Sequence, residues 1–179
     1  MDWKERIDNS WTLFLDRDGV INVRLIDDYV KNINEFQFMP GVLDAFRIFA
    51  ERFGKIIIVT NQQGVGKGLM TLETVDSIHD FMKKMIENQK GRVDAIYVCP
   101  QLKTAPDNFR KPNPKMAYMA KNDFPAIDFS KSIMIGDSNS DIEFGHNAGM
   151  HTILIGDEVT KSVADDRFDS LIQFANTLK

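Results

Sequence analysis

The sequence predicts an α/β protein in which a central parallel sheet carries helices on both faces. Short apolar runs that suit buried strands alternate with longer stretches whose apolar residues recur at helical spacing. Elements that alternate in this order form parallel sheets with right-handed crossovers. Polar candidates for a functional site follow several of the apolar runs, which is where ligands bind in such sheets. The predicted strands are residues 11–15, 55–59, 94–98, 132–135 and 152–155.

The strand predictions depend on apolar and β-branched runs. Residues 11–15 are apolar apart from one threonine, and residues 55–59 read Lys-Ile-Ile-Ile-Val. A β-branched run of this kind suits a strand that is covered on both faces. Two stretches between the elements, 20–40 and 99–112, are long for connections in a compact domain, which favours functional loops.

The helix predictions depend on periodicity and on end signals. The first helix follows Pro40 and Gly41 and ends near Gly54, with its apolar residues on one face. Asn113 and Pro114 form a cap and a first turn for a helix that runs to about residue 122. The other predicted helices span residues 72–89, 141–148 and 171–178.

Composition and charge limit the class of protein. A length of 179 residues favours one domain, and 43% hydrophobic residues are ordinary for a soluble globular protein. The net charge of −4 gives no overall attraction to nucleic acids or anionic membranes. No apolar run approaches a transmembrane length, and the charged N-terminus is unlike a signal peptide. The single cysteine, Cys99, fits a reducing compartment. We therefore expect a cytoplasmic monomer without nucleic-acid or membrane partners.

The candidate site begins with an acidic pair. Asp16 and Asp18 follow the first predicted strand, with Gly19 directly behind them. Alone, this arrangement could be an acidic turn. Thr60 and Asp137, however, follow the second and fourth predicted strands, and the carboxyl ends of parallel strands meet at one edge of a sheet. The sequence therefore predicts a magnesium-dependent site that forms an aspartyl phosphate.

Phosphate-ester chemistry explains why these residue types are needed. A carboxylate that attacks a phosphate ester is repelled by the charge of the phosphoryl group. Mg²⁺ between Asp16 and a phosphoryl oxygen would remove much of this repulsion, and Lys111 would add a positive charge. Thr60 would bind another phosphoryl oxygen. Asp18 could protonate the leaving oxygen and then deprotonate the attacking water.

Each of these residues also has a purely structural interpretation. Thr60 and Asn61 could form an ordinary turn, and Lys111 could be a solvated surface lysine. Asp141 could complement a helix N-terminus, and Arg110 could face solvent instead of binding a distal phosphate. The three histidines show no metal-ligand spacing and are interpreted as structural, as is Cys99; the histidines are His79, His146 and His151.

Together, these motifs resemble those of the haloacid dehalogenase-like (HAD-like) phosphatases over nearly the full chain. The resemblance implies a Rossmann-like three-layer α/β/α fold, formed by a single HAD-like hydrolase domain over residues 1–179. The core elements leave no room for a separate cap domain. The resemblance also implies that Asp16 is the nucleophile, Asp18 the general acid/base, Thr60 a phosphoryl-binding residue and Lys111 the neutralising cation.

The same resemblance implies a ligand set for Mg²⁺. The implied ligands are Asp16, the backbone carbonyl of Asp18, and Asp137, whereas Asp141 supports the metal site. The predicted cofactor is therefore Mg²⁺.

A closer resemblance is to the heptose bisphosphate phosphatases and the related histidinol-phosphate phosphatases. It rests on segments 15–22, 29–30, 36–42, 60–64, 97–100 and 110–114. It implies that the substrate-binding residues are Asn61, Gln62, Gln63, Arg110 and Lys111. The expected substrate is a small phosphorylated sugar, with the C7 phosphate of a heptose bisphosphate as the first choice.

One departure concerns zinc. These relatives usually hold a structural zinc ion through Cys-X-His and a later Cys-X-Cys pair. This chain has Cys99, but Gln101 stands at the histidine position, and Asp107 and Phe109 stand at the later positions. Tetrahedral zinc sites need four ligands, and one thiol cannot supply them. We therefore expect no structural zinc and a loop that is held by other contacts.

Three alternative functions remain open at this level. Histidinol-phosphate hydrolysis is the nearest enzymatic alternative. A receiver-type signalling module is also a parallel α/β domain with carboxylates, Thr and Lys at strand ends, but its phosphorylated Asp follows the third strand, where this chain has Val98 and Cys99. A non-catalytic phosphate-binding protein is disfavoured by the intact set of charged residues.

Overall fold

The computed structural model describes residues 3–179 and places six strands in one sheet. The strands are β1 (Thr12–Leu15), β2 (Lys55–Asn61), β3 (Ala95–Cys99), β4 (Ser132–Gly136), β5 (His151–Ile155) and β6 (Asp166–Phe168). They are parallel throughout, in the order β3-β2-β1-β4-β5-β6. This order is that of doubly wound dinucleotide-binding folds and confirms the predicted Rossmann-like class.

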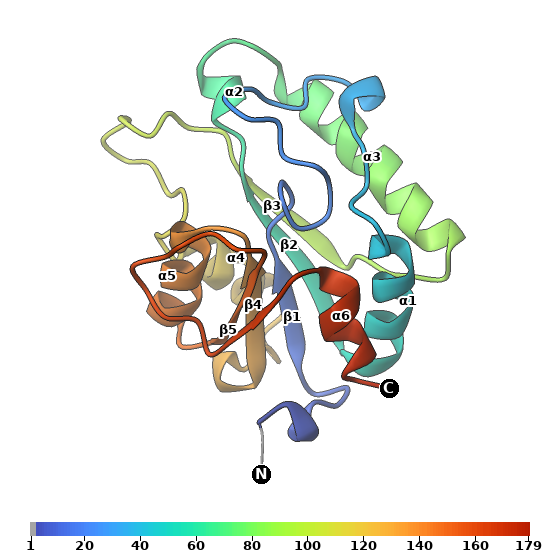
Figure 1. Cartoon of the computed structure of the whole chain (residues 1–179). Coiled ribbons are helices and arrows are strands. Elements are labelled where there is room, and N and C mark those ends of the chain that lie inside the picture. Colours follow the sequence, from blue (N-terminus) through green and yellow to red (C-terminus); the bar gives the residue numbers. More distant parts are fainter. Residues whose placement is uncertain (1–2) are drawn as a thin grey trace.

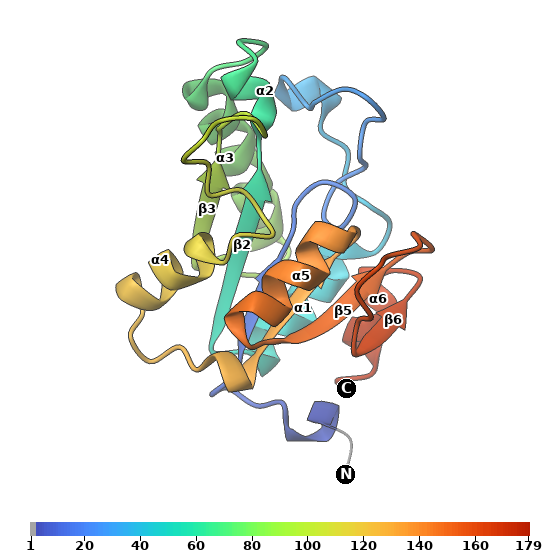
Figure 2. The ribbon, with the colours of Figure 1, turned by 90° about the vertical axis from the view of Figure 1, so that its left-hand side faces the viewer.

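Helices cover both faces of the sheet (Figures 1 and 2). One layer contains α1 (Val42–Arg52), α3 (Leu72–Asn88) and α6 (Leu171–Asn176), and the other contains α4 (Lys115–Asp123) and α5 (Asn139–Ala148). Shorter helical turns are η1 (Trp3–Arg6), η2 (Ile33–Glu35), α2 (Gln63–Gly66) and η3 (Phe129–Lys131). The three-layer arrangement is therefore as expected from the alternation of elements.

Alternating side chains of the central strands form two separate cores. In β1, Leu13 and Leu15 pack into the core beneath α1 and α6, whereas Phe14 packs into the core beneath α4 and α5. All three side chains are fully buried. This two-sided burial explains why the central strands are uninterrupted apolar runs, as is usual for parallel sheets.

The structure differs from the sequence-based expectations at several element ends. β2 extends through Thr60 and Asn61, because Asn61 still pairs with Cys99 of β3. The glycine-rich stretch after β2 begins with the single helical turn α2, which was not expected. Phe53 lies just beyond α1 as its C-cap. The short strand β6 was not expected.

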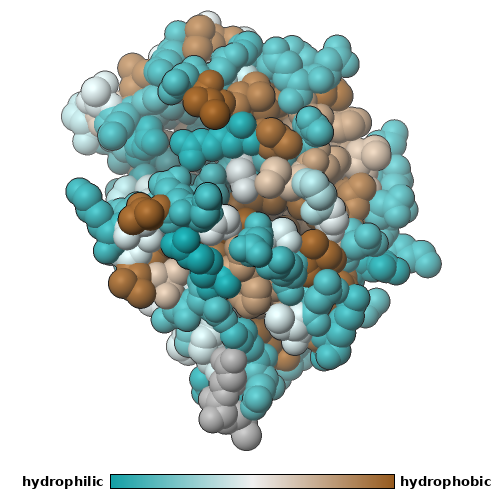
Figure 3. Space-filling view, in the orientation of Figure 1, coloured by the Kyte–Doolittle hydropathy of each residue, from teal (hydrophilic) through white to brown (hydrophobic). Residues whose placement is uncertain are grey.

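The strand order reverses between β1 and β4, and this reversal determines where a ligand can bind. Connections from β1 and β4 leave in opposite directions, so a crevice opens beyond their carboxyl ends. These ends lie away from both chain termini (Figure 1). The face seen in Figure 3 is largely hydrophilic, with hydrophobic residues in small groups. Among the described residues, no helix is long and apolar enough to span a membrane.

Candidate active site

A tight loop after β1 presents the acidic pair. The Asp16 amide still donates to the Ile135 carbonyl of β4 at 2.9 Å, so the sheet fixes the start of this loop. The loop then turns back through Gly19, whose φ of +85° is in the left-handed region. A Cβ atom on Gly19 would lie 1.9 Å from Asp137 Oδ2. Glycine is therefore required here for both the turn and the close approach of Asp137.

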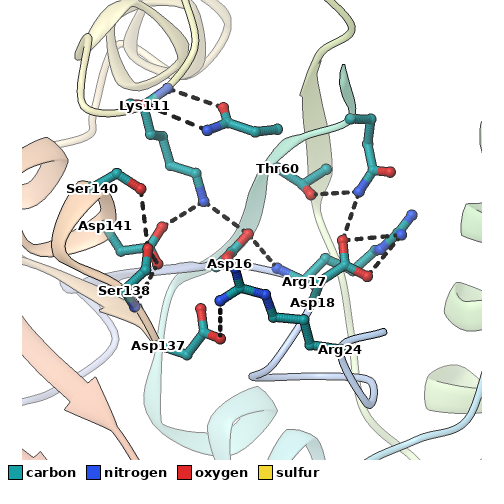
Figure 4. Close-up of polar contacts among 12 residues, drawn as sticks. Asp16, Arg17, Asp18, Arg24, Thr60, Lys111, Asp137, Ser138, Ser140 and Asp141 are labelled. Carbon is teal, nitrogen blue, oxygen red and sulfur yellow. Dashed lines mark hydrogen bonds and ion pairs between the residues drawn. The ribbon is translucent and has the colours of Figure 1, made fainter. Parts of the chain in front are cut away.

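A buried charge cluster occupies the crevice between β1 and β4 (Figure 4). Lys111 reaches in from its loop, and its Nζ lies 2.8 Å from Asp16 Oδ1 and 2.6 Å from Asp141 Oδ1. The side chains of Lys111 and Asp141 are 2% and 0% exposed. Lys111 is therefore a partner of the two carboxylates and not a solvated surface lysine.

Asp141 has a second role at the start of α5. Its Oδ2 accepts hydrogen bonds from the Ser138 amide at 3.1 Å and from the Ser138 hydroxyl at 2.7 Å. The helix N-terminus and Lys111 thus share one carboxylate. The close packing requires Gly136, because a Cβ atom there would lie 2.0 Å from the Asp141 Cβ.

This cluster contains three carboxylates and one lysine. Burial, with Asp141 as the next cause, raises the pKa of Asp16 to about 8, against the lowering effect of Lys111. Burial and Asp141 also raise the pKa of Asp137 to about 6. Burial tends to lower the pKa of Lys111, but Asp141 and Asp16 outweigh it and raise that pKa. The site therefore favours an additional cation.

The donor set fits Mg²⁺. One oxygen each from Asp16, Asp137 and Asp141 lies within 4.8 Å of the others, and these three residues come from the ends of β1 and β4 and the start of α5. Hard oxygen ligands are what Mg²⁺ prefers. A divalent ion here would stabilise the ionised carboxylates that burial disfavours.

Asp18 lies on the other side of Asp16, in a separate network (Figure 4). Its carboxylate accepts from Arg17 Nη2 at 2.9 and 3.1 Å, from Asn22 Nδ2 at 2.9 Å and from Gln62 Nε2 at 2.8 Å. Burial tends to raise the pKa of Asp18, but the charge of Arg17 and these hydrogen bonds lower it overall. Without a ligand in the site, these contacts therefore favour the carboxylate form of Asp18.

Arg17 connects this network to α3. Its side chain is fully buried, and Nη1 lies 3.1 Å from Nε2 of His79. Burial and the charge of Arg17 lower the pKa of His79 to about 3, so the imidazole is neutral and accepts the hydrogen bond. Only the position of Arg17 between two aspartates could have pointed to this contact in the sequence.

The residues after β2 have their polar groups engaged within the protein. Thr60 is fully buried, and its hydroxyl accepts from Gln62 Nε2 at 2.9 Å. Asn61 binds the main chain of Lys111 at both ends: its Oδ1 accepts from the amide at 3.0 Å, and its Nδ2 donates to the carbonyl at 3.4 Å. Thr60 and Gln62 therefore lie behind the cavity, whereas Asn61 and Lys111 line it.

Gln63 also lines the cavity and joins two loops at its rim. Its Nε2 donates to the Tyr29 hydroxyl at 3.2 Å. Its Oε1 accepts from the Lys103 amide at 2.6 Å and from Arg110 Nη1 at 3.4 Å. Arg110 consequently extends along the cavity wall and does not project freely into solvent.

An unexpected cation, Arg24, lies over the acidic cluster. Its Nη1 is 3.4 Å from Asp137 Oδ2 and 3.9 Å from Glu158 Oε2, and its side chain is largely exposed. The cavity has a volume of about 520 Å³. Its cationic lining residues are Arg24, Lys67, Arg110 and Lys111. Six aspartates also line the cavity, three of them in the cluster that would hold a cation. A bound cation together with the four basic side chains would suit a small phosphorylated ligand.

Comparisons with known proteins agree with this geometry. A family model described as HAD-hydrolase-like matches residues 108–175. The D-glycero-alpha-D-manno-heptose-1,7-bisphosphate 7-phosphatase of Mycobacterium tuberculosis is 38% identical over 176 residues, which cover 96% of this chain and 93% of the relative. The chain belongs to the heptose bisphosphate phosphatases of the HAD-like family.

Two further comparisons support this family assignment. The enzyme of the same name from Campylobacter jejuni is 36% identical, with 93% of this chain and 95% of the relative covered. A crystal structure of the D,D-heptose 1,7-bisphosphate phosphatase of B. bronchiseptica, in complex with magnesium and phosphate, matches with a TM-score of 0.84 at 27% identity. It covers 94% of this phosphatase and 97% of that chain.

The signalling alternative is not supported. The phosphatase has its carboxylates at the ends of β1 and β4, and β3 ends at Cys99, which is fully buried. The residue at the end of β3 is therefore not the aspartate that a receiver-type module would phosphorylate there.

Proposed function

We propose that this phosphatase removes the C7 phosphate of D-glycero-D-manno-heptose 1,7-bisphosphate through an aspartyl phosphate on Asp16. The observation that carries the proposal is the contact between Asp16 and Lys111 beside Asp137, at the reversal of strand order. The names of the relatives support the substrate. Asp16 is the only one of the two motif aspartates that contacts Lys111, which favours it as the nucleophile.

The proposed Mg²⁺ ligands are Asp16, Asp137 and the backbone carbonyl of Asp18, with Asp141 supporting the site through Lys111. When bound, the ion would neutralise charge on the phosphoryl group and on the carboxylates around it. Lys111 supplies a further positive charge, 2.8 Å from Asp16 Oδ1. Thr60 would bind a phosphoryl oxygen from behind the cavity, where its hydroxyl is buried beside Gln62.

In the first step, a carboxylate oxygen of Asp16 forms a bond to phosphorus, and the bond from phosphorus to the C7 oxygen breaks. Asp18 enters this step carrying the proton that the preceding hydrolysis step leaves on it, and passes that proton to the leaving oxygen. In the second step, Asp18 accepts a proton from a water molecule that attacks the phosphorus, which releases phosphate and restores Asp16. Arg17, Asn22 and Gln62 stabilise the carboxylate form of Asp18 that this second step needs.

The remaining phosphate of the substrate would lie along the basic wall. Arg110 is held there by Gln63 and is the proposed ligand of the C1 phosphate. The relatives at 36–38% identity carry alpha-heptose in their names, whereas a Yersinia pestis relative at 33% identity carries beta-heptose. We therefore assign the α anomer to this enzyme.

We also propose that the enzyme is a cytoplasmic monomer with one domain and no separate cap. The single cysteine is buried and unpaired, which fits a reducing compartment. Light scattering of the purified protein tests the oligomeric state.

The proposed activity is tested by steady-state kinetics with Mg²⁺. The substrates are both anomers of the bisphosphate and histidinol phosphate, with released phosphate as the measurement. We expect the α anomer to give the highest kcat/KM, no turnover by Asp16→Asn, and normal turnover by Asp76→Asn, an exposed carboxylate on α3. A preference for histidinol phosphate above about tenfold, or ~1.4 kcal/mol, would contradict the substrate assignment.

A further inference from the structure

The loop that leads to Arg110 and Lys111 has four positions of interest. Cys99, Gln101, Asp107 and Phe109 stand at the four positions where the resemblance described above implies zinc ligands. One thiol, one carboxamide, one carboxylate and a phenyl ring do not fit tetrahedral zinc. Within residues 3–179, the one cluster of three or more thiol, imidazole or carboxylate ligands is that of Asp16, Asp137 and Asp141. Another interaction must therefore hold this loop together.

The Gln101 carboxamide contacts the other three positions. Its Oε1 accepts from the Phe109 amide at 3.1 Å and lies 3.9 Å from the Cys99 Sγ. Its Nε2 donates to the Asp107 carbonyl at 3.4 Å. The start and the end of the loop are thus joined through one side chain, which uses both its donor and its acceptor.

We propose that Gln101 is the crosslink of this loop and positions Arg110, so that the enzyme works without structural zinc. The hydrogen bond to the Phe109 amide fixes the residue directly before Arg110. Gln101 acts on the substrate only through Arg110 and is therefore a positioning residue. Its consequence for catalysis rests on the proposed function, whereas its role as a crosslink does not.

The other attachments of the loop determine which kinetic constant depends on Gln101. Asn61 holds the Lys111 main chain from β2, independently of Gln101. Arg110 has a weaker attachment, through Gln63 at 3.4 Å. Loss of Gln101 should therefore leave Lys111 in place beside Asp16 and release Arg110. The expected effect is on substrate binding more than on the chemical step.

The first experiment compares Gln101→Ala with Gln89→Ala, an exposed glutamine at the end of α3. Hydrogen exchange of the Phe109 amide, followed by NMR, should be at least about fivefold faster in Gln101→Ala, as expected for loss of one hydrogen bond. KM for the bisphosphate should rise about fivefold, with kcat within about twofold. Gln89→Ala should match the wild type in both measurements.

Unchanged exchange at Phe109 in Gln101→Ala would overturn the crosslink, whatever the substrate proves to be. Faster exchange with an unchanged KM would overturn the positioning of Arg110. Because exchange needs no substrate, failure of the proposed function cannot be mistaken for failure of the crosslink.

The second experiment measures zinc. Protein purified from zinc-supplemented culture should contain far less than one zinc per chain, and stoichiometric zinc would overturn the proposal. Because Gln101 contacts the Cys99 thiol and the main chain at Asp107 and Phe109, we expect the combined variant Gln101→His, Asp107→Cys and Phe109→Cys to bind one zinc and to lose it to a chelator. A folded variant that binds no zinc would show that these positions do not converge.

Discussion

Asp16 and Asp18 are two residues apart, but their surroundings give them different chemistry. Asp16 shares its crevice with two other carboxylates and one lysine, and its pKa is raised to about 8, mainly by burial. Asp18 is held by Arg17, Asn22 and Gln62, which lower its pKa despite burial. Pairs of carboxyl groups in contrasting environments are typical of sites that divide nucleophilic and acid/base work.

This division predicts the behaviour of Asp18→Asn. The variant keeps the size of the side chain but can neither donate nor accept the proton. Phosphoryl transfer to Asp16 and hydrolysis of the aspartyl phosphate should therefore both slow. A loss of about 10²–10⁴-fold in kcat is typical for removal of a general acid/base. Rapid-quench kinetics provides the measurement. A burst of product followed by turnover at the normal rate would show that Asp18 has no role in the second step.

The placement of the acidic residues could be predicted, because each follows a recognisable apolar run and such runs end at one edge of a sheet. Arg17 and His79 could not be paired in this way. They lie 62 positions apart, and their contact depends on how α3 packs against the loop after β1. The exposed Arg24 likewise resembles any solvated arginine until the fold brings it to Asp137.

At the scale of elements, the turn after β1 determines the position of Asp137. Gly19→Ala should lower the free energy of unfolding by about 1–2 kcal/mol, because φ is positive. It should also weaken Mg²⁺ binding, because the new methyl group would overlap Asp137 Oδ2. Gly149→Ala is the matched control: its φ of +82° is similar, but no atom lies within 4 Å of its Cβ position.

Titration calorimetry with Mg²⁺ and chemical denaturation separate these two effects. Both variants should lose stability, and Gly19→Ala alone should lose affinity for the ion. If the two variants bound Mg²⁺ equally well, the methyl group at position 19 would not displace Asp137, and the close approach of Gly19 to Asp137 would be contradicted.

The contact between α3 and the loop after β1 should make stability depend on pH. The pKa of His79 is lowered from its ordinary value near 6.5 to about 3, so between these values the unfolded chain binds a proton that the folded chain does not. The stabilisation is therefore complete above pH 6.5 and decreases as pH falls toward 3. His79→Gln keeps an acceptor for Arg17 but cannot be protonated.

Denaturation at several pH values provides the test. Between pH 6.5 and 4, the free energy of unfolding of the wild type should fall more steeply than that of His79→Gln, by up to about 1.4 kcal/mol per pH unit. Identical slopes would mean that His79 is not held neutral in the folded protein.

The elements that could be predicted are those with strong patterns, such as the Ile-Ile-Ile-Val run of β2 and the amphipathic α3. β6 could not be predicted, because Asp166–Phe168 has only three residues and no apolar alternation. The helical turn α2 could not be predicted either, because two of its four residues are glycines, which favour helices weakly. Gly64 is nevertheless closely packed, because a Cβ atom there would lie 2.5 Å from the Met70 methyl group.

At the scale of the whole molecule, the alternation of strands and helices predicted a parallel sheet but not the order of its strands. That order depends on which strands pair, and it is the order that places β1 beside β4 and opens the crevice between them. It also explains how a protein with a net charge of −4 can attract an anionic substrate. The positive charge is local: four basic side chains line the cavity, and a divalent ion at the proposed site would offset the aspartates beside them.

The most direct test is a crystal structure of the enzyme with Mg²⁺ and beryllium trifluoride, an analogue of a phosphoryl group. The account predicts that the fluoride complex is bonded to an Asp16 oxygen, that Mg²⁺ contacts both Asp16 and Asp137, and that the Lys111 ammonium group lies beside the complex. A fluoride complex on another residue, or Mg²⁺ that does not contact both aspartates, would contradict it.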